Sequence, residues 1–172
     1  MDSTIIETVT ATPSGGSGLE CSDTPNLVNP DFEAAAWPGA WYPSNSVTIA
    51  DGVGIPQQAD IVAEFHNEGV LEQALIVASS RTYNITFSHR QTTQSFSVVT
   101  ISFGSYDSAT LSFPAGQSPW FSDSVTLRLD GSSGCLPVVF SIKVTLENDV
   151  QEDLRPKVLQ IDNIVITPVS DT

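Results

Sequence analysis

Apolar and polar residues alternate with a period of two in short runs along most of the chain. Gly, Pro, Ser, Asn and Asp, which favour turns, separate the runs, and helical periodicity is nearly absent. This is the pattern of β-strands joined by turns. The clearest runs predict eight strands or more, at residues 60–66, 71–78, 82–90, 95–103, 110–113, 124–129, 136–146 and 158–167.

The run 82–90 shows how such a strand divides between two environments. Tyr83, Ile85 and Phe87 share one face, and the polar even-numbered residues share the other. The run 136–146 repeats this division. One face of each strand therefore packs in a core while the other meets water. The pattern predicts an all-β fold, an antiparallel β-sandwich of two packed sheets.

With 172 residues, the chain has room for one domain of ordinary size. Residues 1–18 are rich in Thr, Ser and Gly and have little to bury, so we expect a linker there. We assign residues 19–168 to the β-sandwich and 169–172 to a polar tail. A Thr-rich leader of this kind favours a domain from a longer modular protein, covalently linked to a catalytic or anchoring part.

The chain is strongly acidic, with 20 Asp and Glu against 6 Lys and Arg and a formal net charge of −14. Such a surface repels phosphate backbones and anionic lipid headgroups, which excludes nucleic acid as a partner. No apolar stretch is long enough to cross a membrane as a helix, so we expect no membrane insertion. The same charge would attract cations, Ca²⁺ included. We expect a monomer.

Two cysteines and a glycosylation sequon help to predict whether the protein is secreted or cytosolic. A disulfide between Cys21 and Cys135 would close a long loop and stabilise the fold by roughly 4–5 kcal/mol in the chain-entropy model. The alternative is two buried free thiols. Asn84, followed by Ile85 and Thr86, lies in a glycosylation sequon. With the low lysine content, these features favour a secreted, extracellular protein, although the sequence begins without a secretory signal, as a cytosolic protein would.

Three segments occur in an informative order: 26–33 (NLVNPDFE) with tryptophans close behind, then 71–75 (LEQAL) with 82–87 (TYNITF), and finally 161–166 (IDNIVI). Together they resemble carbohydrate-binding modules of the four/nine (CenC-like) type, which are appended to many cellulases and xylanases. In that family an Asn-Pro-Gly-Phe-Glu run opens the domain and a strand with Asp beside Asp or Asn closes it. The resemblance covers nearly the whole folded part and implies a galactose-binding-domain-like jelly roll.

The resemblance also implies a non-catalytic domain that holds a glycan, often with a structural Ca²⁺ remote from the sugar. Glu33 and Asp162 match the positions whose carboxylates serve that metal. An ion that prefers six to eight oxygen ligands could join two terminal strands in this way, with backbone carbonyls near residues 66–69 completing the set. The alternative is that both carboxylates cap turns or meet solvent.

Sugars present apolar C–H faces and a rim of hydroxyls, so exposed aromatic rings are the candidates for binding them. Trp37, Trp41 and Tyr42 lie in a stretch whose prolines and glycine predict a loop. The resemblance implies that Trp41 is structural, which leaves Trp37 and Tyr42 as the sugar-binding candidates. Packing in the core is the alternative for each.

Four more residues are candidates for sugar contact. Trp120 precedes a predicted strand, and Tyr106 lies in a predicted turn. Arg90 and Gln91, at the end of the run 82–90, could donate hydrogen bonds to hydroxyls or to a uronate. Members of the family often present an aromatic residue where this chain has Ser88, and a glycan on the sequon would obstruct the same face. Both points argue against a long glucan-binding cleft there.

The sequence lacks the motifs of a serine hydrolase, a zinc protease or a phosphate-binding loop. His89 has the parity of the core face of its strand, which favours a buried and satisfied histidine. We therefore interpret the chain as a non-enzymatic polysaccharide-binding module, accessory to a secreted carbohydrate-active enzyme. The alternatives are an extracellular adhesive or cell-wall interaction module and, third, a small jelly-roll glycoside hydrolase or lyase.

Overall fold

The computed structural model describes residues 21, 24–33, 40–51, 61–92, 95–115, 119–131, 134–147 and 158–170. No helix in these ranges is long and apolar enough to cross a membrane. The strands there are β1 (Trp41–Pro43), β2 (Val47–Asp51), β3 (Ile61–His66), β4 (Glu68–Ala78), β5 (Arg81–Gln91), β6 (Phe96–Phe103), β7 (Asp107–Phe113), β8 (Phe121–Leu129), β9 (Cys135–Glu147) and β10 (Val158–Pro168).

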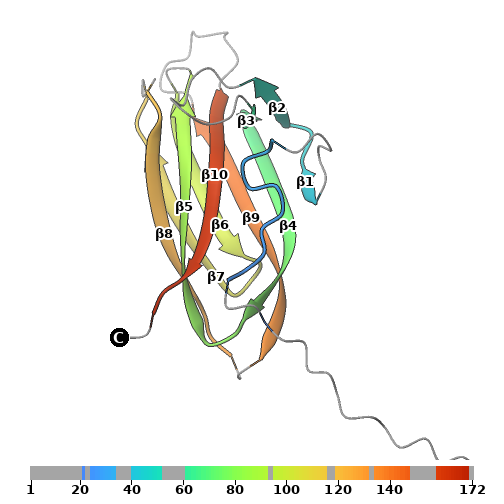
Figure 1. The fold of residues 1–172 in the computed structure, drawn as a ribbon. Helices are drawn as coiled ribbons and strands as arrows, with labels where there is room; N and C mark the ends of the chain where they lie inside the picture. The colour runs from blue at the N-terminus through green and yellow to red at the C-terminus, as the bar shows by residue number, and fades with distance from the viewer. Residues whose placement is uncertain are drawn as a thin grey trace, which may run out of the picture.

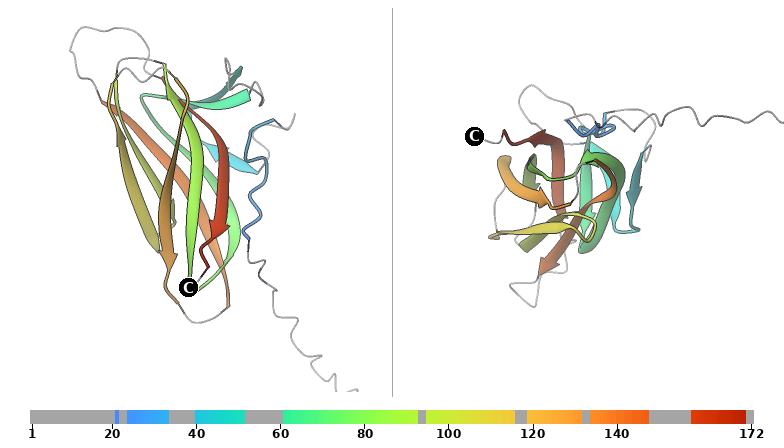
Figure 2. Two further views of the ribbon diagram at one scale, coloured as in Figure 1. Left: turned by 60° about the vertical axis from the view of Figure 1, so that its left-hand side comes forward. Right: turned by 90° about the horizontal axis from the view of Figure 1, so that it is seen from below.

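The strands form two five-stranded antiparallel sheets. The order is β1-β4-β9-β6-β7 in the first sheet and β2-β3-β10-β5-β8 in the second sheet. Strands β5, β8 and β10 lie in front of β6 and β9 in Figure 1, and Figure 2 shows the two layers from other sides. The predicted antiparallel β-sandwich is confirmed.

The apolar half of each alternating strand lines the space between the sheets. Tyr83 and Phe87 of β5 and Phe140 of β9 are at most 1% exposed, as the alternation predicts. Rings from the two sheets also meet directly, because Tyr83 approaches Phe103 edge-on with 5.7 Å between ring centroids. The core is therefore continuous across the sandwich, and the alternate residues of each strand lie on the outer faces.

The segment 24–33 crosses an open side of the sandwich and joins the two sheets (Figure 1). The side-chain amide of Gln73 in β4 accepts a hydrogen bond from the backbone N–H of Val28 (2.7 Å) and donates one to its carbonyl (2.9 Å). The carbonyl of Pro30 accepts from the N–H of Ile164 in β10 (3.1 Å). Phe32 then inserts its ring into the core, where it is 1% exposed.

An irregularity in β10 receives this segment. The register with β5 shifts between Asp162 and Val165, and Asn163 has a φ of 50°. A residue in the left-handed region releases part of the strand from its ladder, and Asn tolerates that conformation better than most residues. The N–H of Ile164 is thereby turned to Pro30. The closing-strand motif thus serves to attach the opening segment.

The region 41–51 differs from the sequence prediction. Trp41 and Tyr42 were expected in a loop, but they form β1, which pairs with β4 from Trp41 opposite Gln73 to Pro43 opposite Leu71. The proline that suggested a loop lies at the end of a three-residue edge strand, where a missing N–H costs no ladder bond. Strand β2 was not predicted either.

The predicted disulfide is confirmed, because Cys21 is bonded to Cys135 at the start of β9. Cys135 lies opposite Ala78 at the end of β4. The bond therefore fixes the beginning of the described chain to the end of the sandwich where β4 and β5 are joined.

Candidate functional site

Two of the three tryptophans can be placed, and their surroundings differ. Trp41 is fully buried, with Phe32 and Phe140 at ring-centroid distances of 5.6 and 6.2 Å. Its indole Nε1 donates to the carbonyl of Asn29 (3.0 Å). Trp41 is thus a structural residue, as the resemblance implied. Trp37 lies outside the described residues.

Trp120 precedes β8 and is only half buried. Its neighbour Phe121 pairs with His89, which brings Trp120 beside Arg90 of β5. The guanidinium carbon of Arg90 lies 5.1 Å from the centroid of the indole ring. The indole Nε1 is buried and meets no hydrogen-bond partner among the described residues. The ring is therefore held beside Arg90, and no described residue accepts a hydrogen bond from its N–H.

Trp120 begins a line of side chains that crosses the outer face of the second sheet. Gln160 of β10 lies opposite Arg90, and the next strands continue in register with Gln160 opposite Glu64 and Glu64 opposite Thr48. We call this set the cross-strand row: Trp120, Arg90, Gln160, Glu64 and Thr48.

Hydrogen bonds connect the cross-strand row. The Nε of Arg90 donates to Oε1 of Gln160 (3.0 Å), and Nε2 of Gln160 donates to Oε1 of Glu64 (2.6 Å). His66 extends the network, with Nε2 lying 3.6 Å from Oε2 of Glu64 and 3.0 Å from Oγ1 of Thr48. Because Gln160 is buried and satisfied on both sides, it fixes the guanidinium and the carboxylate relative to each other.

The other predicted sugar contacts do not join the cross-strand row. Tyr106 is half exposed in the turn between β6 and β7. Asp107, which follows that turn, accepts a hydrogen bond from the N–H of Arg128 (2.6 Å), so the turn lies near the C-terminal end of β8. Trp120 precedes the N-terminal end of the same strand. Tyr42 is 66% exposed at the edge of the first sheet, opposite Glu72.

The prediction for Gln91 was wrong. Gln91 has the inward parity of β5, is 1% exposed, and donates from Nε2 to Oγ of Ser95 (2.8 Å). A surface glycan cannot reach it, because the strand alternation places only every second residue outward. Arg90, one residue earlier, has the outward parity.

His89 is buried, as its parity predicted. It is 1% exposed, stacks on Phe113 with ring centroids 3.9 Å apart, and places Nε2 2.7 Å from Oδ2 of Asp123. Its Nδ1 meets no partner among the described residues, so the predicted histidine is satisfied at one nitrogen only.

The predicted metal ligands lie near the bulge of β10. The carboxylate of Glu33 accepts a hydrogen bond from the backbone N–H of Ile61 (3.0 Å), and the carboxylate of Asp162 accepts one from the backbone N–H of Asn163 (2.7 Å). Burial raises the pKa of Asp162 to about 6; the bond from Asn163 opposes this, and the negative charges of Asp31 and Glu33 add to it. Within the described ranges, no three Asp, Glu, His or Cys side chains form a group that could hold a metal ion.

The sequon residue Asn84 lies on the outer face of the second sheet, opposite Thr126 and Thr167. It is six residues from Arg90 along β5, which corresponds to about 20 Å of extended strand. A glycan at Asn84 would therefore be attached at the far end of this face from the cross-strand row.

Of the residues in and beside the cross-strand row, the sequence analysis named Arg90 and Trp120 as candidates but not Gln160, Glu64, Thr48 or His66. Each has a polar side chain at an outward strand position, which is a weak signal because many surface residues share it. These residues become neighbours only through the order of strands in the second sheet, which places segments from distant parts of the chain side by side.

Comparisons with known proteins identify similar folds. No protein-family model matches the sequence, and no curated protein matches it. Among solved structures, TmCBM61 in complex with β-1,4-galactotriose is 14% identical with a TM-score of 0.55, over 83% of this chain and 97% of that one. A CBM4 module is 16% identical with a TM-score of 0.53, over 84% and 100%.

A cyclase from Fischerella sp. TAU, in complex with 4-(1H-indol-3-yl)butan-2-one, is 12% identical with a TM-score of 0.60, over 86% of this chain and 98% of that one. At such identities the likeness shows the fold alone. The chain therefore has a β-sandwich fold that is shared by carbohydrate-binding modules and by at least one enzyme.

Proposed function

We propose that the chain is a non-catalytic carbohydrate-binding module that holds a glycan along the cross-strand row. The observation that carries this proposal is the alignment of a half-exposed indole with a guanidinium, a carboxylate and a hydroxyl across one sheet. An aromatic face accepts the C–H groups of a sugar, and charged or hydroxyl groups beside it bond to the hydroxyl rim.

The dimensions of the cross-strand row favour a chain of several sugar units. The row has one residue on each of β5, β10, β3 and β2, and Trp120 directly precedes β8, the fifth strand of the second sheet. Four strand spacings of about 4.8 Å give a length of roughly 19 Å. A glycan lying across the strands would meet Trp120 first and Thr48 last. This placement supports binding along a polysaccharide chain rather than capture of a monosaccharide.

The charge of the protein favours a neutral glycan. The row contains one guanidinium and one carboxylate, which are connected through Gln160. The chain as a whole has a formal net charge of −14, so an anionic polysaccharide would be repelled as it approached. Neutral polymers such as glucans, galactans and xylans would not be repelled.

The solved structures support this function by analogy, since TmCBM61 with its galactotriose and the CBM4 module share the fold. The disulfide supports a secreted location, because such bonds persist mainly in oxidising compartments. In this setting the domain would act by tethering, raising the local concentration of a covalently linked enzyme on its polysaccharide.

Affinity electrophoresis on neutral polysaccharides tests the proposal. The unmodified chain and Trp120→Ala are run in gels that contain β-glucan, β-1,4-galactan, xylan or no polymer. Tyr106→Ala is the matched control, because it removes an exposed ring at the other end of the sandwich. We expect one polymer to retard the unmodified chain and Tyr106→Ala but not Trp120→Ala. Equal mobility of all three proteins in every gel would reject the proposal.

We also propose that Ca²⁺ binds at Glu33 and Asp162, with backbone carbonyls as further ligands. Support comes from the buried Asp162 carboxylate, which interacts with the charges of Asp31 and Glu33. A divalent cation would neutralise that repulsion. Calcium should therefore raise the melting temperature of the unmodified chain but not of Asp162→Asn. An equal shift in both proteins would place the ion elsewhere.

A further inference from the structure

Strand β8 forms one edge of the second sheet and lies on the left in Figure 1. Its odd-numbered residues have the inward parity, and Val125 and Leu127 are buried accordingly. Near the start of the strand this parity does not lead to burial, because Phe121 is 39% exposed and the side chain of Asp123 is 43% exposed. The inward side of β8 is therefore open to solvent at the end that adjoins Trp120.

A stack of three rings supports Phe121. The ring centroids of Phe113 in β7 and His89 in β5 lie 3.9 Å apart with the planes at 26°, and those of His89 and Phe121 lie 6.0 Å apart with the planes at 27°. Phe113 and His89 are buried, whereas Phe121 reaches solvent. The stack therefore holds a partly exposed aromatic ring in position, and such a ring can pack on the C–H face of a pyranose.

His89 also orients the carboxylate of Asp123. The Nε2 atom of His89 lies 2.7 Å from Oδ2 of Asp123, and since a carboxylate only accepts hydrogen bonds, the imidazole is the donor. Among the described residues, none donates to Oδ1 of Asp123. Ionised acceptors form short and strong hydrogen bonds with hydroxyl groups. Asp123 thus offers a sugar hydroxyl an acceptor that a buried residue fixes in advance.

The backbone between Phe121 and Asp123 supplies a donor. The N–H of Arg128 bonds to Asp107 of β7, so it is directed away from β5. Ser122 has the same parity as Arg128, and the register of β8 with β5 is continuous between them. Because the N–H groups of alternate residues in a strand point the same way, the N–H of Ser122 is also directed away from β5. An edge-facing donor therefore lies between the ring and the carboxylate.

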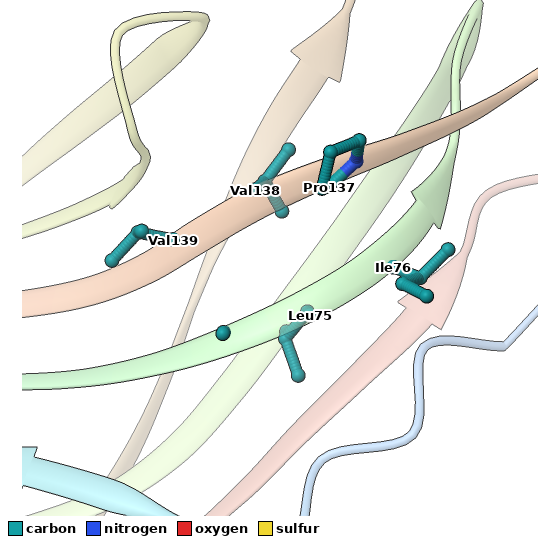
Figure 3. Close-up of a pocket in the computed structure, with 6 residues that line it drawn as sticks. Leu75, Ile76, Pro137, Val138 and Val139 are labelled. Carbon is teal, nitrogen blue, oxygen red and sulfur yellow. The ribbon is translucent and has the colours of Figure 1, made fainter.

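The apolar groove on the other sheet lacks this combination. The groove lies on β4 and β9 of the first sheet and has a volume of about 440 Å³ (Figure 3). Its lining residues are Ala74, Leu75, Ile76, Pro137, Val138 and Val139, and no side chain among them can donate or accept a hydrogen bond. A sugar needs such partners for its hydroxyl groups, which favours the start of β8.

We propose that Phe121, Ser122 and Asp123 form a second sugar subsite on the edge of β8, which takes a terminal pyranose ring of the glycan bound along the cross-strand row. The ring of Phe121 packs on one face of that sugar, Asp123 accepts from its hydroxyl groups, and the N–H of Ser122 donates to a hydroxyl oxygen. Trp120 directly precedes this segment, so the subsite continues the row around the edge of the sheet. The inference rests on the proposed function. The terminal ring belongs either to the end of the main chain or to a single-sugar branch.

Affinity electrophoresis in gels that contain β-glucan, β-1,4-galactan or xylan tests the subsite. Asp123→Asn removes the ionised acceptor but keeps an oxygen that can accept from His89, and Phe121→Ala removes the ring. Retardation at several polymer concentrations gives a dissociation constant. With the polymer that retards the unmodified chain, we expect this constant to rise about tenfold in each variant, the size of one lost charged hydrogen bond. Phe121→Tyr keeps the ring and should keep the affinity.

Two matched controls separate the subsite from general effects. Asp130→Asn makes the same change of charge just past the other end of β8, where Asp130 pairs with Arg128 at the surface. Ile76→Ala removes an exposed apolar side chain from the groove of the first sheet. Both controls should keep the affinity of the unmodified chain. Circular dichroism checks that each variant is folded, and if Asp123→Asn is unfolded, Phe121→Ala decides the question.

The outcomes distinguish the subsite from the proposed function. If Phe121→Ala and Asp123→Asn bind like the unmodified chain while Trp120→Ala does not bind, the subsite is rejected and the proposed function stands. If no polymer retards the unmodified chain, the proposed function fails and the subsite fails with it.

Trimming the retarding polymer with an exo-glycosidase that removes single-sugar branches identifies the source of the terminal ring. If the ring comes from a branch, the difference in affinity between the unmodified chain and Asp123→Asn should disappear after trimming. If it comes from the end of the main chain, the difference should survive.

Discussion

Trp41 and Trp120 show how one residue type serves two purposes in this sandwich. Trp41 is enclosed by rings and its indole N–H is bonded to Asn29, so every part of it is used within the protein. Trp120 is half buried, lies against Arg90, and has an N–H without a partner among the described residues. A structural aromatic residue is thus buried with its polar atom hydrogen-bonded, whereas a candidate binding residue is partly exposed and has a polar atom without a described partner.

The largest expected effect is the loss of stability on truncating the structural tryptophan. Trp41→Ala removes the ring between Phe32 and Phe140 and the bond to Asn29. We expect the free energy of unfolding to fall by about 3–5 kcal/mol. Urea denaturation measures it, and a loss below about 1 kcal/mol would contradict the structural role.

The next effect concerns Asp162 and pH. Its pKa is raised from 3.8 to about 6 in the folded protein, so the native state binds more protons than the unfolded state between these values. Above pH 6 the ionised Asp162 therefore lowers the free energy of unfolding, and below pH 3.8 it has no effect on it. The free energy of unfolding falls as the pH rises from 3.8 to 6. At 1.36 kcal/mol per pKa unit, the full penalty is of order 3 kcal/mol.

Asp162→Asn should remove this penalty. With chelator present, we expect the variant to be more stable than the unmodified chain at pH 7 by about 2–3 kcal/mol and equally stable near pH 3.5. Urea denaturation of both proteins across this range measures the difference. Two curves that stay parallel from acid to neutral pH would contradict the raised pKa.

A smaller effect is expected where the cross-strand row is connected. Gln160→Leu removes the hydrogen bonds that Gln160 makes with Arg90 and Glu64, which costs about 1–3 kcal/mol. The same change should weaken glycan retention although Trp120 remains. Ser124→Ala, on the same outer face, serves as the control for both measurements. Unchanged retention by Gln160→Leu would remove Gln160 from the site.

The smallest effect completes the comparison of the two tryptophans. Trp120→Ala should lower the free energy of unfolding by only about 1 kcal/mol, the size of a cation–π contact near the surface. Its effect on glycan retention should nevertheless be complete. If thermal denaturation showed a loss as large as that of Trp41→Ala, Trp120 would be a core residue.

The fold could be predicted from the sequence because alternation is a local signal. In β5, parity alone placed Phe87 inward and Arg90 outward. The same rule would have excluded Gln91 from the surface had it been applied one residue further. Strand β1 was missed because three residues ending in Pro43 carry no periodicity, and only pairing with β4 makes them a strand.

The site was harder to predict because it depends on which strands are neighbours. Arg90, Gln160 and Glu64 are far apart in sequence, and they meet only through the order β5-β10-β3. No local pattern encodes that order. The sugar-binding roles of Trp37, Tyr42, Arg90, Tyr106 and Trp120, the Ca²⁺ ligands and the domain boundaries all stay predictions.

The disulfide has a consequence for how the domain could be mounted. Cys21 is fixed at Cys135, and the N–H of Val169 donates to the carbonyl of Thr82, so the described chain both enters and leaves near the junction of β4 and β5. Trp120 lies at the opposite pole of the sandwich. A neighbouring domain joined at either of these points would be attached at the end of the sandwich away from Trp120, so it would leave the proposed glycan site accessible.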